Sequence, residues 1–354
     1  MLVPAKSSAP VNVIITDETV ARLYLHRLLD CFAARLIRIE PIVLKCGEDT
    51  KSLACYSTVA ERCLEFGVRR TSTIYSFGGG VISNIAGFVA ATLYRGLDLV
   101  HIPTTMLAQV DGAVDTKQAV NSKHGKNLVG AHYYPRAVVV DPSFLMSLSL
   151  DQLVDGLAEF VKHAIAADGQ ALTLLSGKLS LTDVAWLTAV VTRAIDLKVT
   201  IRKRFPETDY SEMSTQYGHC VAHALEHLTS HRLSHGRAIS IGMCVSAELG
   251  RHLGVTADSV VQAHYELLTS LGLPVGIPEA VNVDELWRQM SYDKNNDGKN
   301  IRMGLVQSIG RIAPNAFGGF SHPITFEVFN EAYTSNVVAT QAGRYRSDLG
   351  PYPY

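Results

Sequence analysis

Residues 72–88 read STIYSFGGGVISNIAGF, in which a short apolar stretch leads through three glycines into a helical pattern. A strand that runs into a helix in this way is the repeating unit of α/β domains, whose sheets are mainly parallel. The junction exposes helix-terminal N–H groups that suit a phosphate. The glycine pattern is incomplete, because Ser83 stands where a further glycine is usual. A nucleotide-binding loop and a plain tight turn therefore both stay open.

The alternation of strand and helix extends to both sides of this stretch. Strand signals occur within residues 11–32, 35–53, 97–114 and 136–145. After about residue 148 the periodicity becomes helical, with few strand signals. We therefore predict two domains, an α/β domain with a mainly parallel sheet at residues 1–148 and a mostly α-helical domain at residues 149–354.

The composition is that of an ordinary globular protein of 354 residues. The net charge is −1, from 32 basic and 33 acidic residues, which gives no bulk attraction to nucleic acid or to a membrane. The start lacks the apolar core of a signal peptide, and no run is long enough to span a bilayer. The six cysteines include no C-x-x-C pair. We expect reduced thiols in a cytoplasmic protein.

Residues 217–236 carry a ladder of histidines at intervals of four: His219, His223, His227, His231 and His235. Four residues turn about 400° in a helix, so neighbours such as His219 and His223 share a face. His219 and His235 would lie about 24 Å apart along an unbroken helix. Residues 228–236, LTSHRLSHG, form a poor helix interior. A helix that ends near residue 230, followed by a returning loop, would bring His235 back to His219.

The ladder predicts at least one metal site. Imidazoles bind zinc well, and a catalytic zinc has three protein ligands and an open position. Glu159 lies on an apolar helical segment, GLAEFVKHAI, and a buried glutamate needs a partner, so it could complete the ligand set. We expect His227 and His231 to be ordinary surface or core residues.

A rival interpretation of the ladder is a zinc peptidase. HALEH matches H-x-x-E-H, with His223 and His227 as ligands and Glu226 as the base. This interpretation leaves the glycine run and the lysines of the chain without a role.

Residues 110–130, VDGAVDTKQAVNSKHGKNLVG, are rich in lysine, asparagine and glycine. Lysines and asparagines on loops suit a phosphorylated or otherwise anionic small molecule, although a solvated charged loop has the same composition. The stretch CGEDTKSL adds Glu48 and Lys51, which could hold ribose hydroxyls or a phosphate, or simply form a solvated turn.

Taken together, these segments resemble the sugar-phosphate cyclases, the family of 3-dehydroquinate synthase, over about residues 12 to 310. The motifs that carry the resemblance, in order, are TDETVA, GEDTK, FGGGVISNIAGFVAATLYRG, IPTTMLAQVD, KQAVN, GKNLVG, GLAEFVKH, YGHCVAHALE, SHGRAISIGM and DKNNDG. The resemblance implies a Rossmann-like NAD-binding domain and a helical metal- and substrate-binding domain, the dehydroquinate synthase-like fold. It also implies a divalent metal, zinc or cobalt, in the cleft between the domains, and a homodimer.

The resemblance also assigns roles by position. The implied metal ligands are Glu159, His219 and His235. The implied catalytic residues are Asp111, Lys117, Lys162 and His223, of which His223 contacts the substrate near its phosphate. The implied substrate-binding residues are Arg95, Lys126, Asn127, Lys198, Gln216 and Lys294. The implied NAD contacts are Asp17, Glu48, Lys51, Gly78, Gly79, Gly80, Asn84, Thr104 and Thr105.

The implied reaction is that of a phosphate-eliminating carbon–oxygen lyase. A ring hydroxyl of a sugar phosphate is oxidised, phosphate leaves by elimination, the ring is reduced again and an aldol step closes a carbocycle. NAD is regenerated in each cycle and so acts as a catalyst. A catalytically inactive relative that only binds a nucleotide is the non-enzyme alternative.

Several positions depart from the quinate enzymes of this family. Those enzymes bind the carboxylate of their substrate with an arginine seven residues before the first ladder histidine, where this chain has Glu212. Asparagine is replaced by Gln216, G-G-K-T by residues 115–118, DTKQ, and the aspartate after the glycine run by Asn84. NIAG, KQAVN and KNLVG resemble the subgroup that cyclises glucose 6-phosphate to 2-deoxy-scyllo-inosose in antibiotic biosynthesis. Cyclases of the quinate type and of the 2-epi-5-epi-valiolone type are the alternatives.

Overall fold

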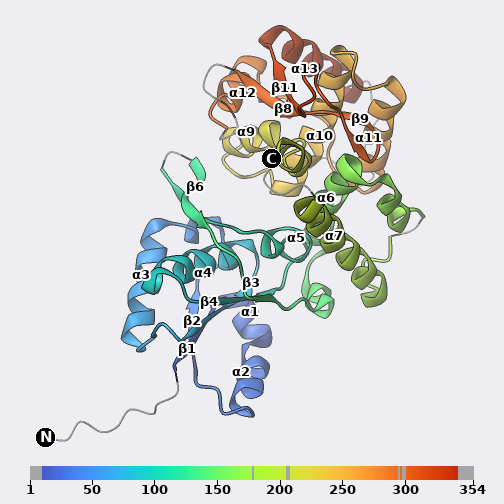
Figure 1. The fold of residues 1–354 in the computed structure, drawn as a ribbon. Helices are drawn as coiled ribbons and strands as arrows, with labels where there is room; N and C mark the ends of the chain where they lie inside the picture. The colour runs from blue at the N-terminus through green and yellow to red at the C-terminus, as the bar shows by residue number, and fades with distance from the viewer. Residues whose placement is uncertain are drawn as a thin grey trace, which may run out of the picture. The chain divides into compact units, whose positions relative to one another are not determined.

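The computed structural model describes residues 10–123, 125–177, 179–204, 208–293, 296 and 300–341. The chain divides into two compact units, Met1–Leu148 and Ser149–Tyr354 (Figure 1). The first is built on a parallel sheet, and the second is mostly helical, so the predicted fold class is confirmed. Among the described residues, no helix has both the length and the apolar character that crossing a membrane requires.

A five-stranded sheet forms the centre of the first unit, in the order β2-β1-β3-β4-β7 with every pair parallel. The strands are β1 (Asn12–Asp17), β2 (Ile39–Leu44), β3 (Thr73–Gly78), β4 (Asp98–Pro103) and β7 (Ala137–Val138). The helices are α1 (Glu18–Val20), which continues as one π turn into α2 (His26–Ala33), then α3 (Leu53–Glu65), α4 (Gly80–Thr92) and α5 (Met106–Val110). Because β1 pairs with β2 on one side and with β3 on the other, the chain changes direction across the sheet at this point.

Alternate residues of β1 serve the two faces of the sheet, as the two-residue period of a strand requires. Val13 and Ile15 enter a core with residues of α3 and α4. Ile14 enters a second core that includes Phe77 and residues of α2. Both faces of the sheet are therefore covered, which explains why its strands are apolar runs.

A two-stranded antiparallel hairpin, β5 (Lys117–Ser122) and β6 (Gly125–His132), completes the first unit. The prediction that the lysines and asparagines of this segment lie on loops is wrong for Lys117, Asn121, Lys126 and Asn127, which are on the two strands, while Lys123 lies in the turn between them. The hairpin packs on α4, where Asn84 accepts a hydrogen bond from the Ala119 backbone N–H at 3.0 Å. Packing against α4 thus keeps this segment in strands, although its sequence has little intrinsic strand preference.

The second unit surrounds one central helix, α10 (His235–His252), which is buried on nearly all sides. Its other helices are α6 (Leu150–Ala167), α7 (Val184–Arg204), α8 (Asp209–Thr215), α9 (His219–Leu228), α11 (Asp258–Ser270), α12 (Val283–Met290) and α13 (Phe326–Gln341). Helix α10 packs against α6, α9, α11 and α13. Two short antiparallel pairs, which the sequence pattern missed, are β8 (Ile301–Gly304) with β11 (Ser321–Ile324) and β9 (Val306–Ser308) with β10 (Arg311–Ile312).

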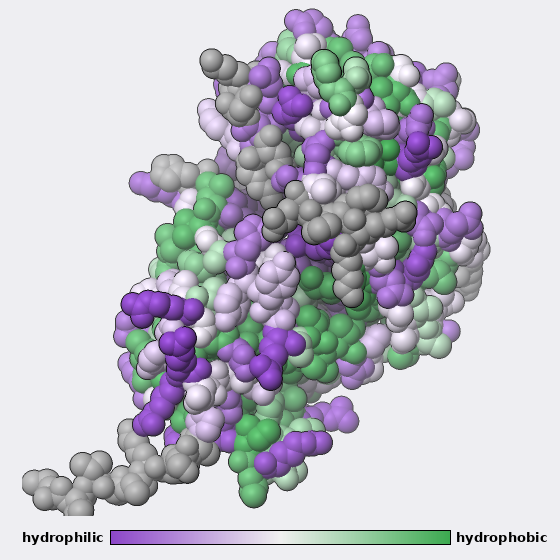
Figure 2. All heavy atoms as spheres, in the orientation of Figure 1, coloured by the Kyte–Doolittle hydropathy of each residue, from purple (hydrophilic) through white to green (hydrophobic). Residues whose placement is uncertain are grey.

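The surface mixes both kinds of side chain. On the face drawn in Figure 2, hydrophilic and hydrophobic residues are interspersed over each unit. Large apolar side chains that are exposed, such as Leu36, Tyr134 and Phe317, belong to separate segments of the chain. A protein surface of this kind is ordinary, since apolar atoms always contribute a large share of it.

Candidate metal and cofactor sites

Glu159 is a fully buried carboxylate on α6 of the second unit. The helix begins with a capping box. The Gln152 N–H donates to the Ser149 hydroxyl, and the Ser149 N–H donates to the Gln152 side-chain oxygen. One turn after Glu159, the ammonium of Lys162 pairs with Glu159 Oε2 and donates to the Thr215 carbonyl at 2.7 Å. This pairing explains how a charged glutamate is accommodated inside the unit.

His219 is the first residue of α9, and a glycine fixes its position. Gly218 has φ of +78°, and a Cβ there would lie 2.9 Å from the Met243 backbone nitrogen. Only glycine therefore fits where α9 starts against α10. The ring Nδ1 of His219 lies 3.4 Å from the Tyr217 carbonyl, so the neutral imidazole donates there and turns Nε2 away.

His235 is the first residue of α10, after a chain reversal in which Ser230 and His231 both have positive φ. As expected, α9 ends close to residue 230, at Leu228, and a turn returns the chain to His219. Asp155 of α6 holds the start of α10, because its Oδ1 accepts hydrogen bonds from Ser234 Oγ and from the Arg237 N–H, the latter at 3.0 Å.

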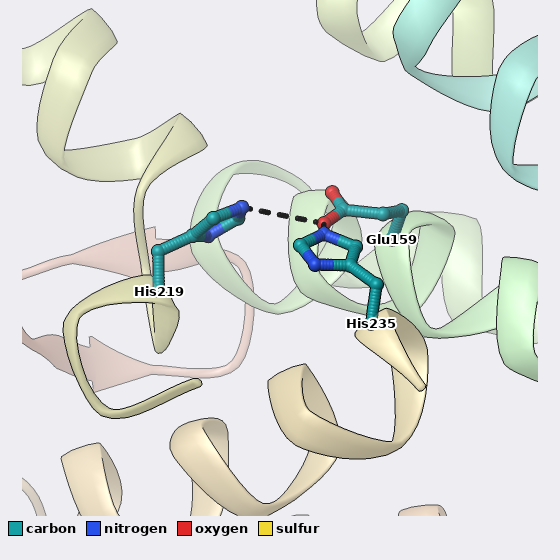
Figure 3. A group of neighbouring side chains, drawn as sticks. All are labelled: Glu159, His219 and His235. Atoms are coloured by element: carbon teal, nitrogen blue, oxygen red, sulfur yellow. Dashed lines mark hydrogen bonds and ion pairs between the residues drawn. The ribbon is translucent and has the colours of Figure 1, made fainter. Parts of the chain in front are cut away.

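Glu159, His219 and His235 converge from three helices, as Figure 3 shows. Glu159 Oε1 lies 3.2 Å from His235 Nε2 and 3.4 Å from His219 Nε2. One ligand atom from each residue lies within 4.8 Å of the others. Two imidazoles and a carboxylate are the donors that zinc and cobalt prefer. The described residues therefore fit a divalent metal here, with three protein ligands.

The charge of His235 depends on two carboxylates. Burial by itself lowers its pKa, but Glu226 and Glu159 more than offset that effect and raise the pKa to about 10. Glu226 Oε2 lies 3.4 Å from His235 Nδ1, on the opposite edge of the ring from Glu159. This group of side chains consequently attracts positive charge, whether a proton or a metal ion.

The other three ladder histidines differ from these two. The His223 ring packs edge-on against His219 with centroids 5.2 Å apart, and its Nδ1 lies 2.9 Å from Asp293 Oδ2. His227 and His231 are exposed. The sequence prediction missed Asp293, whose side chain is buried beside His223. A carboxylate just before the lysine of DKNNDG was the available signal.

Two predicted substrate residues of the second unit, Lys198 and Gln216, lie on α7 and directly after α8. Lys198 of α7 is almost fully buried. Gln216 is the residue that ends α8, and Glu212 of the same helix is exposed. Lys294 lies outside the described residues. Substrate binding by these residues stays a prediction.

In the first unit, the predicted NAD contacts gather at the carboxyl edge of the sheet. Asp17 ends β1, Gly78 ends β3 with Gly79 and Gly80 leading into α4, and Thr104 follows β4 with its N–H bonded to the Gly78 carbonyl at 3.0 Å. Thr105 caps α5 by accepting from the Ala108 N–H. In open α/β sheets, ligands bind at this edge where the strand order changes direction, here between β1 and β3.

Two of these predicted contacts already have structural roles. Asp17 Oδ1 caps α1 by accepting from the Thr19 and Val20 N–H groups at 2.9 and 3.0 Å. The Asn84 amide joins Gly80 to Ala119, as described above, and so anchors the hairpin to α4. Their role as cofactor contacts stays a prediction.

A polar network joins the GEDTK stretch to the hairpin. Asn121 Nδ2 donates to Glu48 Oε1 at 2.8 Å, and Lys51 Nζ donates to Asn127 Oδ1 at 2.5 Å. Asn127, with φ of +57°, donates its N–H to Asn121 Oδ1. The structure thus brings predicted cofactor residues, Glu48 and Lys51, beside a predicted substrate residue, Asn127.

The last predicted residues of this unit are dispersed. Arg95 follows α4 and, like Tyr94, has positive φ just before Gly96. Asp111 ends α5. Lys117 begins β5 and Lys126 lies on β6, so both are on the hairpin. Their contacts with a substrate stay predictions.

Comparison with known proteins adds the family. Residues 41–155 match the 3-dehydroquinate synthase N-terminal family and residues 156–296 match the 3-dehydroquinate synthase C-terminal family. A 2-deoxy-scyllo-inosose synthase of Micromonospora echinospora is 34% identical over 320 residues, which are 90% of this chain and 79% of that protein. A 3-dehydroquinate synthase of Campylobacter jejuni subsp. jejuni is also 34% identical, over 84% of this chain and 86% of that protein.

Solved structures agree with these relatives. A 2-deoxy-scyllo-inosose synthase complexed with carbaglucose-6-phosphate, NAD+ and Co2+ superposes with a TM-score of 0.83 and 28% identity, covering 93% of this chain and 91% of that one. A 2-epi-5-epi-valiolone synthase of Streptomyces hygroscopicus subsp. jinggangensis 5008, with NAD+ and Zn2+ bound, also gives 0.83, at 26% identity and 95% and 92% coverage. The zinc-peptidase interpretation is therefore wrong, and the chain belongs to the 3-dehydroquinate synthase family of sugar-phosphate cyclases.

Proposed function

We propose that this protein is an NAD- and metal-dependent cyclase that converts glucose 6-phosphate into 2-deoxy-scyllo-inosose with loss of phosphate. The convergence of Glu159, His219 and His235 carries the proposal, because it supplies a metal site in a family whose solved members were seen with Co2+ or Zn2+. The family resemblance further supports a carbon–oxygen lyase that acts as a homodimer in the cytoplasm.

In this proposal, Glu159, His219 and His235 hold a divalent cation, zinc or cobalt. Such a cation makes a bound hydroxyl more acidic and stabilises the negative charge that develops on oxygen. Lys162 neutralises part of the charge of Glu159 through their ion pair and fixes the carboxylate with Oε1 toward the two imidazoles. Oε1 is thus the carboxylate oxygen that would face the cation.

The first unit is the proposed NAD site. Its support is the carboxyl edge of the sheet, where β1 and β3 are neighbours and the Thr104 N–H donates to the Gly78 carbonyl at the end of β3, just before α4. NAD held here would supply a reversible hydride acceptor, so it would not be consumed. Glu48, oriented by Asn121, is suited to accept hydrogen bonds from ribose hydroxyls.

The substrate phosphate is proposed to contact His223, with Lys198 as a cation of the second unit. Asp293 accepts the Nδ1–H of His223 and so directs Nε2 to the other edge of the ring. The charge of Lys198 and a hydrogen bond from His223 would stabilise the departing phosphate.

The choice of a sugar without a carboxylate rests on position 212. A carboxylate bound in a closed site needs a cation, or its desolvation is uncompensated. Glu212 occupies the position of the quinate enzymes' arginine, and it is exposed on α8. A neutral ring with one phosphate therefore fits this chain better than a sugar acid phosphate, with sedoheptulose 7-phosphate as the second choice.

The test supplies the protein with NAD, Co2+ or Zn2+ and each candidate in turn: glucose 6-phosphate, sedoheptulose 7-phosphate and the seven-carbon acid phosphate. Phosphate release is followed and the carbocycle is identified by NMR. We expect turnover of glucose 6-phosphate without accumulation of NADH. NADH formed in step with product would indicate a simple dehydrogenase, and preference for the acid phosphate would indicate a 3-dehydroquinate synthase.

A further inference from the structure

Glu226 is a buried carboxylate of α9 that the proposed reaction does not use. The H-x-x-E-H pattern would make it a base between His223 and His227, yet His227 is exposed. The Glu226 side chain instead meets His235, nine residues later, with Oε2 3.4 Å from Nδ1. We propose that Glu226 is a positioning residue, which accepts the Nδ1–H of His235 and thereby holds Nε2 toward the metal. This inference rests on the metal site of the proposed function.

The chemistry of the imidazole supports this role. A neutral ring carries one proton, and the group that accepts it decides which nitrogen is left to bind a metal. His235 Nε2 lies 3.2 Å from Glu159 Oε1, and a metal ion bound by both atoms would take the lone pair of Nε2, so the proton of the neutral ring would be on Nδ1. Glu226 lies at the nitrogen where that proton belongs. A carboxylate partner also makes the ligand more basic and binds its ring in one orientation.

The two histidine ligands are held differently. His219 Nδ1 faces a neutral backbone carbonyl, that of Tyr217, whereas His235 Nδ1 faces the carboxylate of Glu226. His235 Nδ1 therefore faces a charged outer partner. Loss of Glu226 would remove both a hydrogen bond and a negative charge from the neighbourhood of the cation.

The backbone of His235 is fixed independently of Glu226. Asp155 binds Ser234 and the N–H of Arg237, on either side of His235. A Cβ at Gly236 would lie 1.8 Å from the Asp155 carbonyl oxygen, so α6 and α10 are in direct backbone contact here. Substitution of Glu226 should consequently release the ring of His235 while the start of α10 keeps its place.

The experiment titrates Co2+ into the metal-free full-length protein by calorimetry and records the visible d–d absorption of the bound ion. We expect Glu226→Ala to bind Co2+ ~10- to 100-fold more weakly, with a changed absorption spectrum. Glu226→Gln keeps a carbonyl acceptor but loses the charge, so its affinity should fall between those of Glu226→Ala and the unchanged protein. The visible spectrum reports the ligand geometry, which a loss of general stability would not alter.

Glu248→Gln is the matched control. Glu248 is equally buried in the same unit, on α10, where it accepts from Tyr265 and pairs with Arg251. Its substitution should leave Co2+ affinity and spectrum unchanged. Equal losses in Glu248→Gln and Glu226→Gln would overturn the inference, since any buried charge would then have the same effect.

Glu159→Gln separates this inference from the proposed function. If Glu159→Gln loses Co2+ while Glu226→Ala binds as the unchanged protein does, Glu226 has no positioning role and the metal site stands. If Glu159→Gln binds Co2+ normally, the metal site itself is wrong. Should Glu226→Ala fail to fold by circular dichroism, Glu226→Gln decides: a several-fold loss supports the inference, and affinity within about twofold overturns it.

Discussion

His235 and His264 lie in the same unit and in opposite environments. His235 is flanked by two carboxylates, which raise its pKa to about 10. His264 of α11 is fully buried between the Tyr217 hydroxyl, 3.0 Å from Nε2, and the Val260 carbonyl, 2.7 Å from Nδ1. Burial lowers its pKa to about 4. The difference shows that the facing groups, and not the residue type, decide whether a histidine is a site for cations or a neutral part of the core.

Substitution of His235 tests this contrast between the two histidines most directly. His235→Ala removes a proposed ligand, so Co2+ retention and activity should fall by more than the ~100-fold that loss of an outer partner costs. His231 is an exposed histidine of the ladder, and His231→Ala should change Co2+ retention and activity by less than about twofold. Metal content after dialysis and phosphate release measure the two effects. If His227 proved essential for the metal and His235 dispensable, the assigned ligands would be wrong.

The buried neutral His264 predicts that the free energy of unfolding depends on pH. His264 has a folded pKa of about 4 against an unfolded value near 6.5. The unfolded chain therefore binds the proton first, so stability is complete above pH 6.5 and declines as the pH falls to 4. The loss amounts to about 3 kcal/mol. His101 of the first unit, buried against Ser76 with its pKa also lowered to about 4, adds a similar slope there.

Urea unfolding at pH 7, 5.5 and 4 measures this slope for the second unit. His264→Gln should unfold with a smaller pH dependence than the unchanged protein. An equal slope in His264→Gln and the unchanged protein would mean that His264 is not buried in its neutral form.

His223 tests an intermediate case, a partly exposed histidine with one carboxylate. Asp293→Asn keeps an acceptor for Nδ1–H but removes the charge, which is worth about 1.5 kcal/mol for a hydrogen bond to a charged group. We expect KM for the sugar phosphate to rise roughly tenfold with a smaller change in kcat, since His223 is proposed to bind the phosphate. Steady-state kinetics decides. An unchanged KM would remove His223 and Asp293 from the phosphate site.

The smallest effect is expected at an exposed charge. Glu212→Arg should raise the ratio of kcat/KM for the acid phosphate over that for glucose 6-phosphate by up to about fivefold, the range of exposed ion pairs. In the unchanged protein the ratio should be below one, measured at one ionic strength. A ratio above one would return the protein to the quinate branch of its family.

The sequence carried the outline of this molecule because its local signals agreed with the global fold. The strand-to-helix pattern around residues 72–88 marks β3 and α4, and the broken helix pattern near residue 230 marks the turn between α9 and α10. The hairpin β5–β6 was not predicted from the sequence, because lysine, asparagine and glycine have little strand preference. Packing against α4 holds the two strands in place.

Side-chain partners were less accessible to sequence reasoning. Whether Glu226 meets His227 or His235 depends on the direction in which the chain leaves the turn at residues 229–234. Asp293 and His223 are 70 residues apart, and only packing of the helical unit joins them. Contacts of this kind depend on tertiary geometry, for which a single sequence offers no periodic signal.

The burial of α10 on nearly all sides has a consequence for the lifetime of the bound ion. Backbone amides of such a helix exchange with solvent only when the whole unit opens, whereas peripheral helices open in smaller fluctuations. His235, a proposed ligand, is the first residue of this helix, so local opening of α11 or α13 would leave it in place. Release of the ion would then require cooperative opening of the second unit. The rate of metal release would therefore measure the kinetic stability of that unit.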